Sequence, residues 1–142
     1  MPQPGEILRY YDWPFEDGSK GDKLLVVLNI AENIDLPCLV LKTTSQSKRY
    51  EGVRQGCNPH PYPPKRVFFI PLHWQECFSV ATYIQLAEIF EIPTEELLQG
   101  ALSKRIRMMG SLSADCFTQL KNCLKRFKED ISKLHWNLIF KS

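Results

Sequence analysis

Short aliphatic runs, each closed by turn-forming residues, set the strongest limit on what the first half of this chain can fold into. Leu24–Leu28 and Cys38–Leu41 hold only a few consecutive apolar residues, and Ile7–Tyr11 mixes apolar and polar side chains. Gly, Pro, Asp and Asn punctuate the stretches between these runs. Runs this short and rich in Val, Ile and Leu favour strands over helices. They predict a small β-barrel, with further strands at Val67–Leu72 and Val80–Leu86.

Residues 51–66 interrupt this strand pattern. The segment EGVRQGCNPHPYPPKR contains four prolines and two glycines. Proline fixes φ and lacks a backbone N–H donor, so a segment this rich in it suits neither a helix nor a central strand. We therefore expect a loop here.

The last third of the chain predicts two helices. Thr94 is a suitable N-cap for a short helix over 94–100, and Gly100 is a suitable end. A second, longer helix is expected over 113–134, because apolar residues recur there every third or fourth position. These are Phe117, Leu120, Leu124, Phe127, Ile131 and Leu134.

This apolar stripe has two interpretations. It is a face buried against the barrel, or a seam for a partner helix or a second copy of the chain, since its members also step by seven. The apolar tail at 134–142 poses the same choice between docking on the core and docking on a partner.

Length and composition point to one α+β domain over 1–142. We expect a small, mostly antiparallel SH3-like barrel at about 5–90, followed by a C-terminal amphipathic helix. The aliphatic runs are too short to cross a bilayer, and the first residues lack the pattern of a signal peptide. Five cysteines at irregular spacing then indicate reduced thiols and a cytoplasmic location.

The net charge of +2 conceals blocks of opposite sign. Residues 42–66 carry six cations and one anion, and residues 104–142 carry nine cations and three anions. Residues 1–41 and 67–103 are acidic. Basic blocks of this kind favour polyanions such as nucleic acid, although a solvated lysine face also produces them.

The segment LVLKTTSQSKR at 39–49 joins a buried strand to a basic, hydroxyl-rich run. One interpretation is the wall of a nucleic-acid groove, in which hydroxyls bind phosphate, cations attract the backbone and tyrosines stack on unpaired bases. The other is a polar turn whose hydroxyls cap the backbone. The candidate binding residues are Lys42, Thr44, Ser45, Lys48, Arg49, Tyr50, Arg54 and Tyr62.

A second candidate site has the spacing C-x2-H-x12-H-x3-C, formed by Cys57, His60, His73 and Cys77. Two thiolates and two imidazoles suit tetrahedral zinc. The alternative is two inert cysteines, a loop histidine and a packed histidine. Without a metal, His60 is also a candidate general acid–base, because the unperturbed pKa of histidine lies near neutrality.

The order of these segments resembles the MazF/PemK family of toxins. The resemblance is carried by GEILRYYDWPFEDG at 5–18, KLLVVLN at 23–29, LVLKTTSQ at 39–46, TYIQLAEI at 82–89 and GSLSADCFTQLKNCLKRF at 110–127. It implies an SH3-like barrel that forms a homodimer, pairs with an antitoxin and cuts single-stranded RNA without a metal or other cofactor. By position, Lys23 stands where the family has a catalytic arginine, and Thr44 stands at its threonine.

Lysine at position 23 departs from that pattern. Arginine holds two phosphate oxygens with a planar fork, whereas lysine is a flexible point charge. The resemblance therefore leaves two functions open. One is a metal-independent endoribonuclease toxin with altered catalytic residues, and the other is a non-catalytic barrel module that binds a protein partner or nucleic acid.

Overall fold

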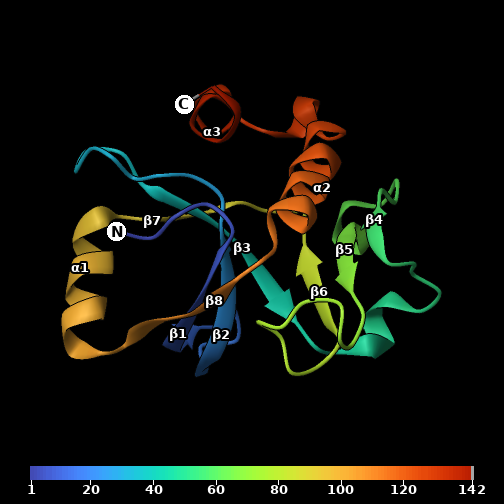
Figure 1. Cartoon of the computed structure of the whole chain (residues 1–142), viewed down its shortest axis with the longest axis horizontal. Coiled ribbons are helices and arrows are strands. Elements are labelled where there is room, and N and C mark those ends of the chain that lie inside the picture. The colour runs from blue at the N-terminus through green and yellow to red at the C-terminus, as the bar shows by residue number, and fades with distance from the viewer. Residues whose placement is uncertain (142) are drawn as a thin grey trace.

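The aliphatic runs of the first half form strands in the computed structural model of the chain, which describes residues 1–141 (Figure 1). Each predicted run lies within or overlaps a strand, and most of the strands extend into the flanking polar residues. The strands that follow the predicted runs are β1 (Glu6–Pro14), β2 (Lys20–Val27), β3 (Cys38–Thr44), β5 (Val67–Ile70) and β6 (Thr82–Gln85).

Three further strands were not predicted. β4 (Gly56–Asn58) lies inside the segment expected to be a loop, β7 covers Phe90–Ile92, and β8 covers Ile106–Ser111. β4 and β7 are three residues each, too short to show a period of two. The 51–66 segment is otherwise irregular, with a 3-10 turn at Pro63–Lys65.

All strand pairs are antiparallel, and they build one sheet in the order β4-β5-β6-β3-β2-β1-β8, with β7 pairing to β3 off this path. β3 is the centre of the sheet. It pairs with β2 along one edge, and its other edge is shared by β7 at Cys38–Val40 and β6 at Thr43–Thr44. The expected α+β class with a mostly antiparallel, barrel-like sheet is confirmed.

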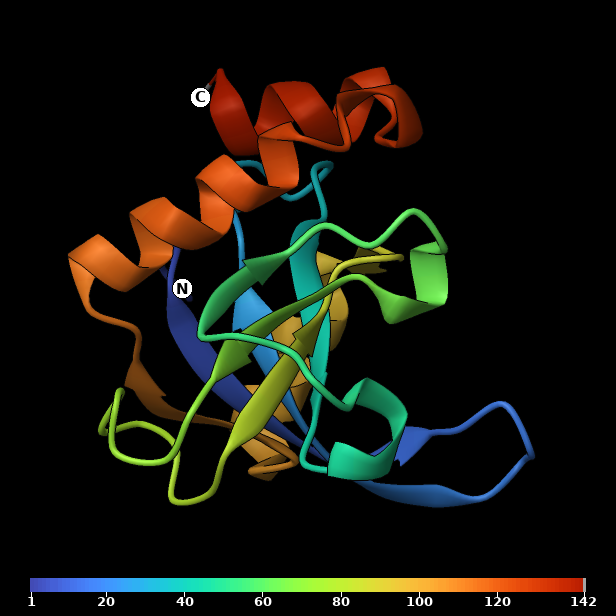
Figure 2. The same ribbon diagram turned by 90° about the vertical axis from the view of Figure 1, so that its right-hand side faces the viewer.

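The helices are α1 (Thr94–Ser103), α2 (Ala114–Lys125) and α3 (Lys133–Phe140). A single helix over 113–134 was wrong, because the chain turns at Phe127 and begins again at Ser132, whose hydroxyl accepts from the His135 amide and caps α3. In Figures 1 and 2, α2 and α3 lie together on one side of the sheet. No helix within residues 1–141 is long and apolar enough to span a membrane.

Two main apolar cores occupy the two sides of the sheet. The larger contains Leu120, Leu124 and Phe127 from the apolar stripe, so burial against the sheet is the correct interpretation for these residues. Ile139 of α3 joins the same core, so the tail docks there through α3, and residue 142 lies outside the described residues. The second core is formed under α1, where Leu97 packs with residues of β1 and β2.

The cysteines overturn the expectation that all thiols are reduced. Cys57 of β4 and Cys123 of α2 form a disulfide across 66 residues of sequence. Cys38, Cys77 and Cys116 carry free thiols. Burial raises the pKa values of Cys38 and Cys116 to about 12, so these two thiols are poor nucleophiles near neutral pH.

Candidate nucleic-acid interface

The antiparallel pairing of β2 and β3 brings Lys23 to the end of β3. The backbone pairing of the two strands ends at Leu25 and Lys42, and hydrogen bonds from two side chains join the residues just beyond that pair. The Thr43 hydroxyl donates to the Leu24 carbonyl (2.8 Å), and Lys23 Nζ donates to the Thr43 carbonyl (2.9 Å). The two positions expected to be catalytic, Lys23 and Thr44, therefore lie at the same place in the sheet.

Lys23 is surrounded by other cations. It is half-buried, and burial lowers the pKa of its ammonium group, with smaller contributions in the same direction from Lys42 and Arg49. Three cations from β2, β3 and the 3-10 turn at Ser47–Tyr50 thus form one group, which we call the Lys23 cluster. A concentration of like charge that depresses a lysine pKa is favourable for a polyanionic ligand.

Aromatic rings lie beneath these cations. Lys23 Nζ lies 5.6 Å from the centre of the Phe15 ring, and Lys42 Nζ lies 4.7 Å from that of Phe90. Trp13 contacts Phe90 edge to face at 5.8 Å. Phe15 and Phe90 were not among the residues expected from sequence. Phe90 reaches Lys42 only because β7 pairs with β3, which no local pattern indicates.

α1 adjoins this aromatic group through Glu96. The Tyr10 hydroxyl donates to a Glu96 carboxylate oxygen (2.5 Å), and the Tyr10 ring contacts Trp13 at 5.1 Å. Burial and this hydrogen bond raise the pKa of Tyr10 to about 12. Glu96 thus connects α1 to the aromatic residues beside the site.

The hydroxyl-rich run divides into two parts. Thr44 is half-buried at the end of β3, and its hydroxyl accepts from the Gln46 amide (3.2 Å), which is the turn-capping role of the alternative interpretation. Ser45, Lys48 and Arg49 are exposed on the turn that follows. The Thr44 hydroxyl thus fixes the backbone of the turn, and the exposed cations Lys48 and Arg49 follow it.

Tyr50, which the sequence analysis expects to stack on bases, is covered by neighbouring side chains. It is buried, stacks on Tyr83 with ring centres 5.2 Å apart, and receives a hydrogen bond from Gln85 Nε2 (3.0 Å). Tyr83 stacks in turn on Phe69. A hollow of about 280 Å³ opens beside these rings and Lys48. The exposed tyrosine of the segment is Tyr62.

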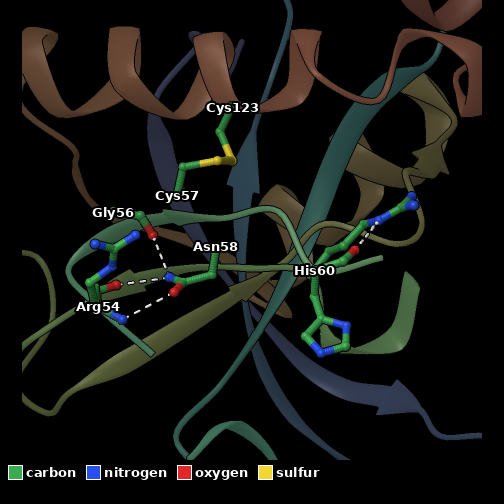
Figure 3. Close-up of a disulfide and its surroundings, with 7 residues drawn as sticks. Arg54, Gly56, Cys57, Asn58, His60 and Cys123 are labelled. Carbon is green, nitrogen blue, oxygen red and sulfur yellow. Dashed lines mark hydrogen bonds between the residues drawn. A yellow bond between two sulfur atoms is a disulfide. The ribbon is translucent and has the colours of Figure 1, made fainter. Parts of the chain in front are cut away.

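Arg54 is carried by the turn before β4 (Figure 3). The Asn58 side chain accepts from the Arg54 amide (3.0 Å) and donates to the Arg54 carbonyl (2.8 Å). Next to Asn58, the Cys57–Cys123 disulfide attaches this turn to α2. Lys65 Nζ donates to the Arg49 carbonyl (2.8 Å), which joins the same proline-rich segment to the Lys23 cluster.

Two of the four residues of the candidate zinc site have other partners. Cys57 is in the disulfide. His60 accepts through Nδ1 from the Tyr62 amide (3.0 Å), and its carbonyl accepts from Arg66, so its contacts lie within its own loop. Within residues 1–141, no group of three or more His, Cys, Asp or Glu side chains is arranged to hold a metal ion.

The fold can be compared with known proteins. Two crystal structures of the MazE–MazF complex from Deinococcus radiodurans, in crystal forms II and III, contain a chain of similar fold, with TM-scores of 0.53 and 0.54. The matches cover 89% and 90% of this chain and 94% and 96% of the other, at 14% and 15% identity. No family model and no curated protein matches the sequence. The chain therefore has a MazF-like fold.

Proposed function

We propose that this protein binds single-stranded RNA at the Lys23 cluster and cleaves it as the toxin of a toxin–antitoxin pair. The observation that carries the proposal is the position of Lys23 beside Thr43 and Thr44 at the end of β3, with Lys42 and Arg49 close enough to act on its charge. The fold likeness to chains of MazE–MazF complexes supports it.

The proposed reaction is an internal transfer within RNA. The ribose 2′-oxygen attacks the adjacent phosphorus and forms a 2′,3′-cyclic phosphate as the bond to the 5′-oxygen breaks. Water takes the proton of the 2′-hydroxyl, and the leaving 5′-oxygen takes a proton from water. Lys23 stabilises the negative charge that builds on the phosphate oxygens, and the Thr44 hydroxyl hydrogen-bonds the same group. Neighbouring cations hold the RNA backbone, namely Lys42, Lys48, Arg49 and Arg54.

The test is incubation of the purified protein with a long single-stranded RNA in EDTA. We expect discrete RNA fragments from the wild type. Thr44→Ala should cleave RNA more slowly by about a hundredfold or more. Thr118→Ala, which changes an exposed threonine of α2, is the matched control and should cleave like the wild type. Equal cleavage by Thr44→Ala and wild type would remove Thr44 from the site.

A non-catalytic role is the second candidate, and the chemistry of Lys23 favours it. Its ammonium group already donates to the Thr43 carbonyl, and it lacks the fork with which an arginine holds two oxygens. In this case RNA binds and stays intact. Lys23→Arg separates the two candidates, because it should raise cleavage if the site is catalytic and leave RNA intact if it is not.

The remaining parts of the proposal concern assembly and location. A toxin of this kind acts as a homodimer, is held inactive by an antitoxin, and meets RNA in the cytoplasm. A reducing cytoplasm would act on the Cys57–Cys123 bridge, which lies on the segment that carries Arg54. RNA affinity should therefore be measured on both the oxidised and the reduced protein. The molecular mass of each form in solution should be measured as well, because it reports whether the protein is a dimer.

A further inference from the structure

Three lysines of α2 and the turn after it lie on one face and carry unmatched charge. Lys121, Lys125 and Lys128 are four and three residues apart, the spacing at which helical side chains are neighbours. Lys125 and Lys128 are exposed and Lys121 is half-buried. Within residues 1–141 none of the three is in an ion pair; the residues that are paired are Arg9–Asp22, Arg66–Asp130 and His135–Glu91.

Aromatic rings of α3 lie beneath these ammonium groups. Lys121 Nζ and Lys125 Nζ lie 5.6 and 5.5 Å from the centre of the Phe140 ring. Lys128 Nζ lies 5.0 Å from the centre of the Trp136 ring, and the centres of the two rings are 4.2 Å apart. We call these three lysines and two rings the α2–α3 face.

Stability of the fold explains only part of this arrangement. A ring attracts an ammonium group, and Lys125 is in the last turn of α2, where a cation interacts favourably with the helix dipole. Lys121 and Lys125 are nevertheless four residues apart, and like charges at that spacing repel each other. A carboxylate at either position would stabilise the helix instead. The surplus of positive charge therefore favours a polyanionic ligand.

The proline-rich segment connects the α2–α3 face with the Lys23 cluster. At one end Lys65 Nζ donates to the Arg49 carbonyl (2.8 Å), and at the other Arg66 pairs with Asp130 (2.9 Å) and lies over the Phe127 ring. In Figure 2 the green turn at Pro63–Lys65 lies between the turn at Ser47–Tyr50 below and the turn after α2 above. The two basic blocks of the sequence are thus joined along one side of the molecule.

The surroundings of the rings favour RNA over a lipid surface. A helix that lies in a membrane needs a free apolar face to enter the bilayer, and the apolar face of α2 is buried in the core through Leu120 and Leu124. Trp136 and Phe140 are half-buried under the lysines. Cations that follow a phosphate backbone, with rings on which unpaired bases stack, are the components of a single-strand binding surface.

We propose that the α2–α3 face binds the phosphate backbone of single-stranded RNA at a distance from the bond that is cut. That the same strand also occupies the Lys23 cluster rests on the proposed function. Binding at the face itself rests on its lysines and rings, which the proposed reaction does not use. The face therefore contributes to affinity for RNA and leaves the chemical step unchanged.

The test uses a fluorescein-labelled 2′-O-methyl oligouridylate of about 20 nucleotides. It has no free 2′-hydroxyl to attack phosphorus, so fluorescence anisotropy reports binding without cleavage. Lys125→Gln/Lys128→Gln should weaken binding by about tenfold, and the slope of log affinity against log salt should fall by about 0.7 for each lysine removed. Lys125→Arg/Lys128→Arg keeps both charges and should bind like the wild type.

The matched control removes two exposed cations of the same basic block beside α1. It is Lys104→Asn/Arg107→Gln, in which asparagine accepts the positive φ of 63° at position 104. This variant has the same net charge as Lys125→Gln/Lys128→Gln and should bind like the wild type. In cleavage of unmodified RNA, Lys125→Gln/Lys128→Gln should raise KM and leave kcat unchanged.

Three results would overturn the inference. The first is an affinity and salt slope unchanged in Lys125→Gln/Lys128→Gln, and the second is an equal loss in the matched control. The third is wild-type protein that binds phosphatidylglycerol vesicles through Lys125 and Lys128 but does not bind the oligouridylate, which would make a membrane the occupant.

These outcomes separate the face from the Lys23 cluster. Wild-type protein that binds the oligouridylate through Lys125 and Lys128 but leaves unmodified RNA intact would contradict the proposed cleavage and support the α2–α3 face. Cleavage by a protein whose RNA affinity does not depend on these lysines would contradict the face alone.

Discussion

The two outer strands of the sheet, β4 and β8, differ in how their open edges are protected. At one end, β4 is covered by α2 and bonded to it through Cys57–Cys123, and Arg66 next to β5 forms an ion pair with Asp130 beyond α2. At the other end, β8 is unpaired on its outer side within residues 1–141 and is surrounded by exposed methionines and leucines. Edge strands must be covered, charged or bent to avoid unwanted pairing. One end is covered within the chain, and the other is bent and charged.

This difference indicates how stability is distributed. Interactions at the β4 end join segments distant in sequence and should contribute to the free energy of unfolding. The exposed side chains at the β8 end, such as Leu102 and Met108, should contribute little. Four predictions test this contrast, beginning with the largest effect.

Removing the disulfide should have the largest effect. We expect Cys123→Ser to lower the free energy of unfolding by about 2–5 kcal/mol, because the bridge restricts a long loop in the unfolded chain. Urea denaturation followed by circular dichroism measures the change. Cys77→Ser, at a half-buried free thiol, is the control. A loss below about 1 kcal/mol in Cys123→Ser would show that the β4 end does not depend on its covalent link.

The Lys23 cluster lies between the two ends and should respond to pH. Its lysine pKa is lowered from 10.5, so Lys23 loses its charge at a lower pH than an ordinary lysine. RNA affinity should therefore begin to fall at a lower pH in the wild type than in Lys23→Arg. The affinity lost should be about tenfold, because one charged contact is removed. The same shift means that the unfolded chain binds the proton more tightly, so Lys23 makes the fold more stable as pH rises. Coincident pH profiles for the two proteins would contradict this account.

Arg66 should make a smaller contribution to the β4 end. It pairs with Asp130 (2.9 Å), and its guanidinium lies 4.4 Å from the centre of the Phe127 ring. Asp130 is largely exposed, so solvent screens the ion pair and we expect Arg66→Gln to cost about 1 kcal/mol. A double-mutant cycle with Asp130→Asn isolates the ion pair, whose coupling should be below about 1 kcal/mol. A larger coupling would mean that the pair is shielded from water.

The smallest effect belongs to the β8 end. Leu102→Gln should change the free energy of unfolding by less than about 0.5 kcal/mol, because its side chain is already in water. Leu97→Ala, on the buried face of the same helix, should cost about 2–5 kcal/mol. Equal effects of the two substitutions would show that Leu102 is packed in solution.

The sequence predicted those parts of the fold that depend on local pattern. The aliphatic runs located β1, β2, β3, β5 and β6, and the apolar stripe located α2. β4 and β8 were missed because Gly-Cys-Asn is too short to show a period, and because IRMMGS combines exposed methionines with a glycine bend. The division of the last helix was missed because the apolar spacing continues through the turn, whereas Ser132 is a cap that the periodicity does not register.

Part of the candidate site was also predictable from the sequence. Lys23 and Thr44 came from the family resemblance, and their neighbourhood follows from the pairing of adjacent strands. Phe90 could not be assigned, because it reaches Lys42 through β7 and β3, which are far apart in sequence. The burial of Tyr50 was not evident from the sequence, because it stacks on Tyr83, which is far from it along the chain. The bond of Cys57 to Cys123 was equally invisible, since it joins residues separated by 66 positions.

The Cys57–Cys123 bond also closes the chain between these two residues into a covalent ring. Every element from β5 to β8, including α1, lies between the two bonded cysteines. A protease that cuts the exposed turn after α1 would leave two fragments still joined through sulfur. They would migrate as one species until a thiol reductant was added. The α1–β8 turn can therefore be severed without separating the chain into pieces.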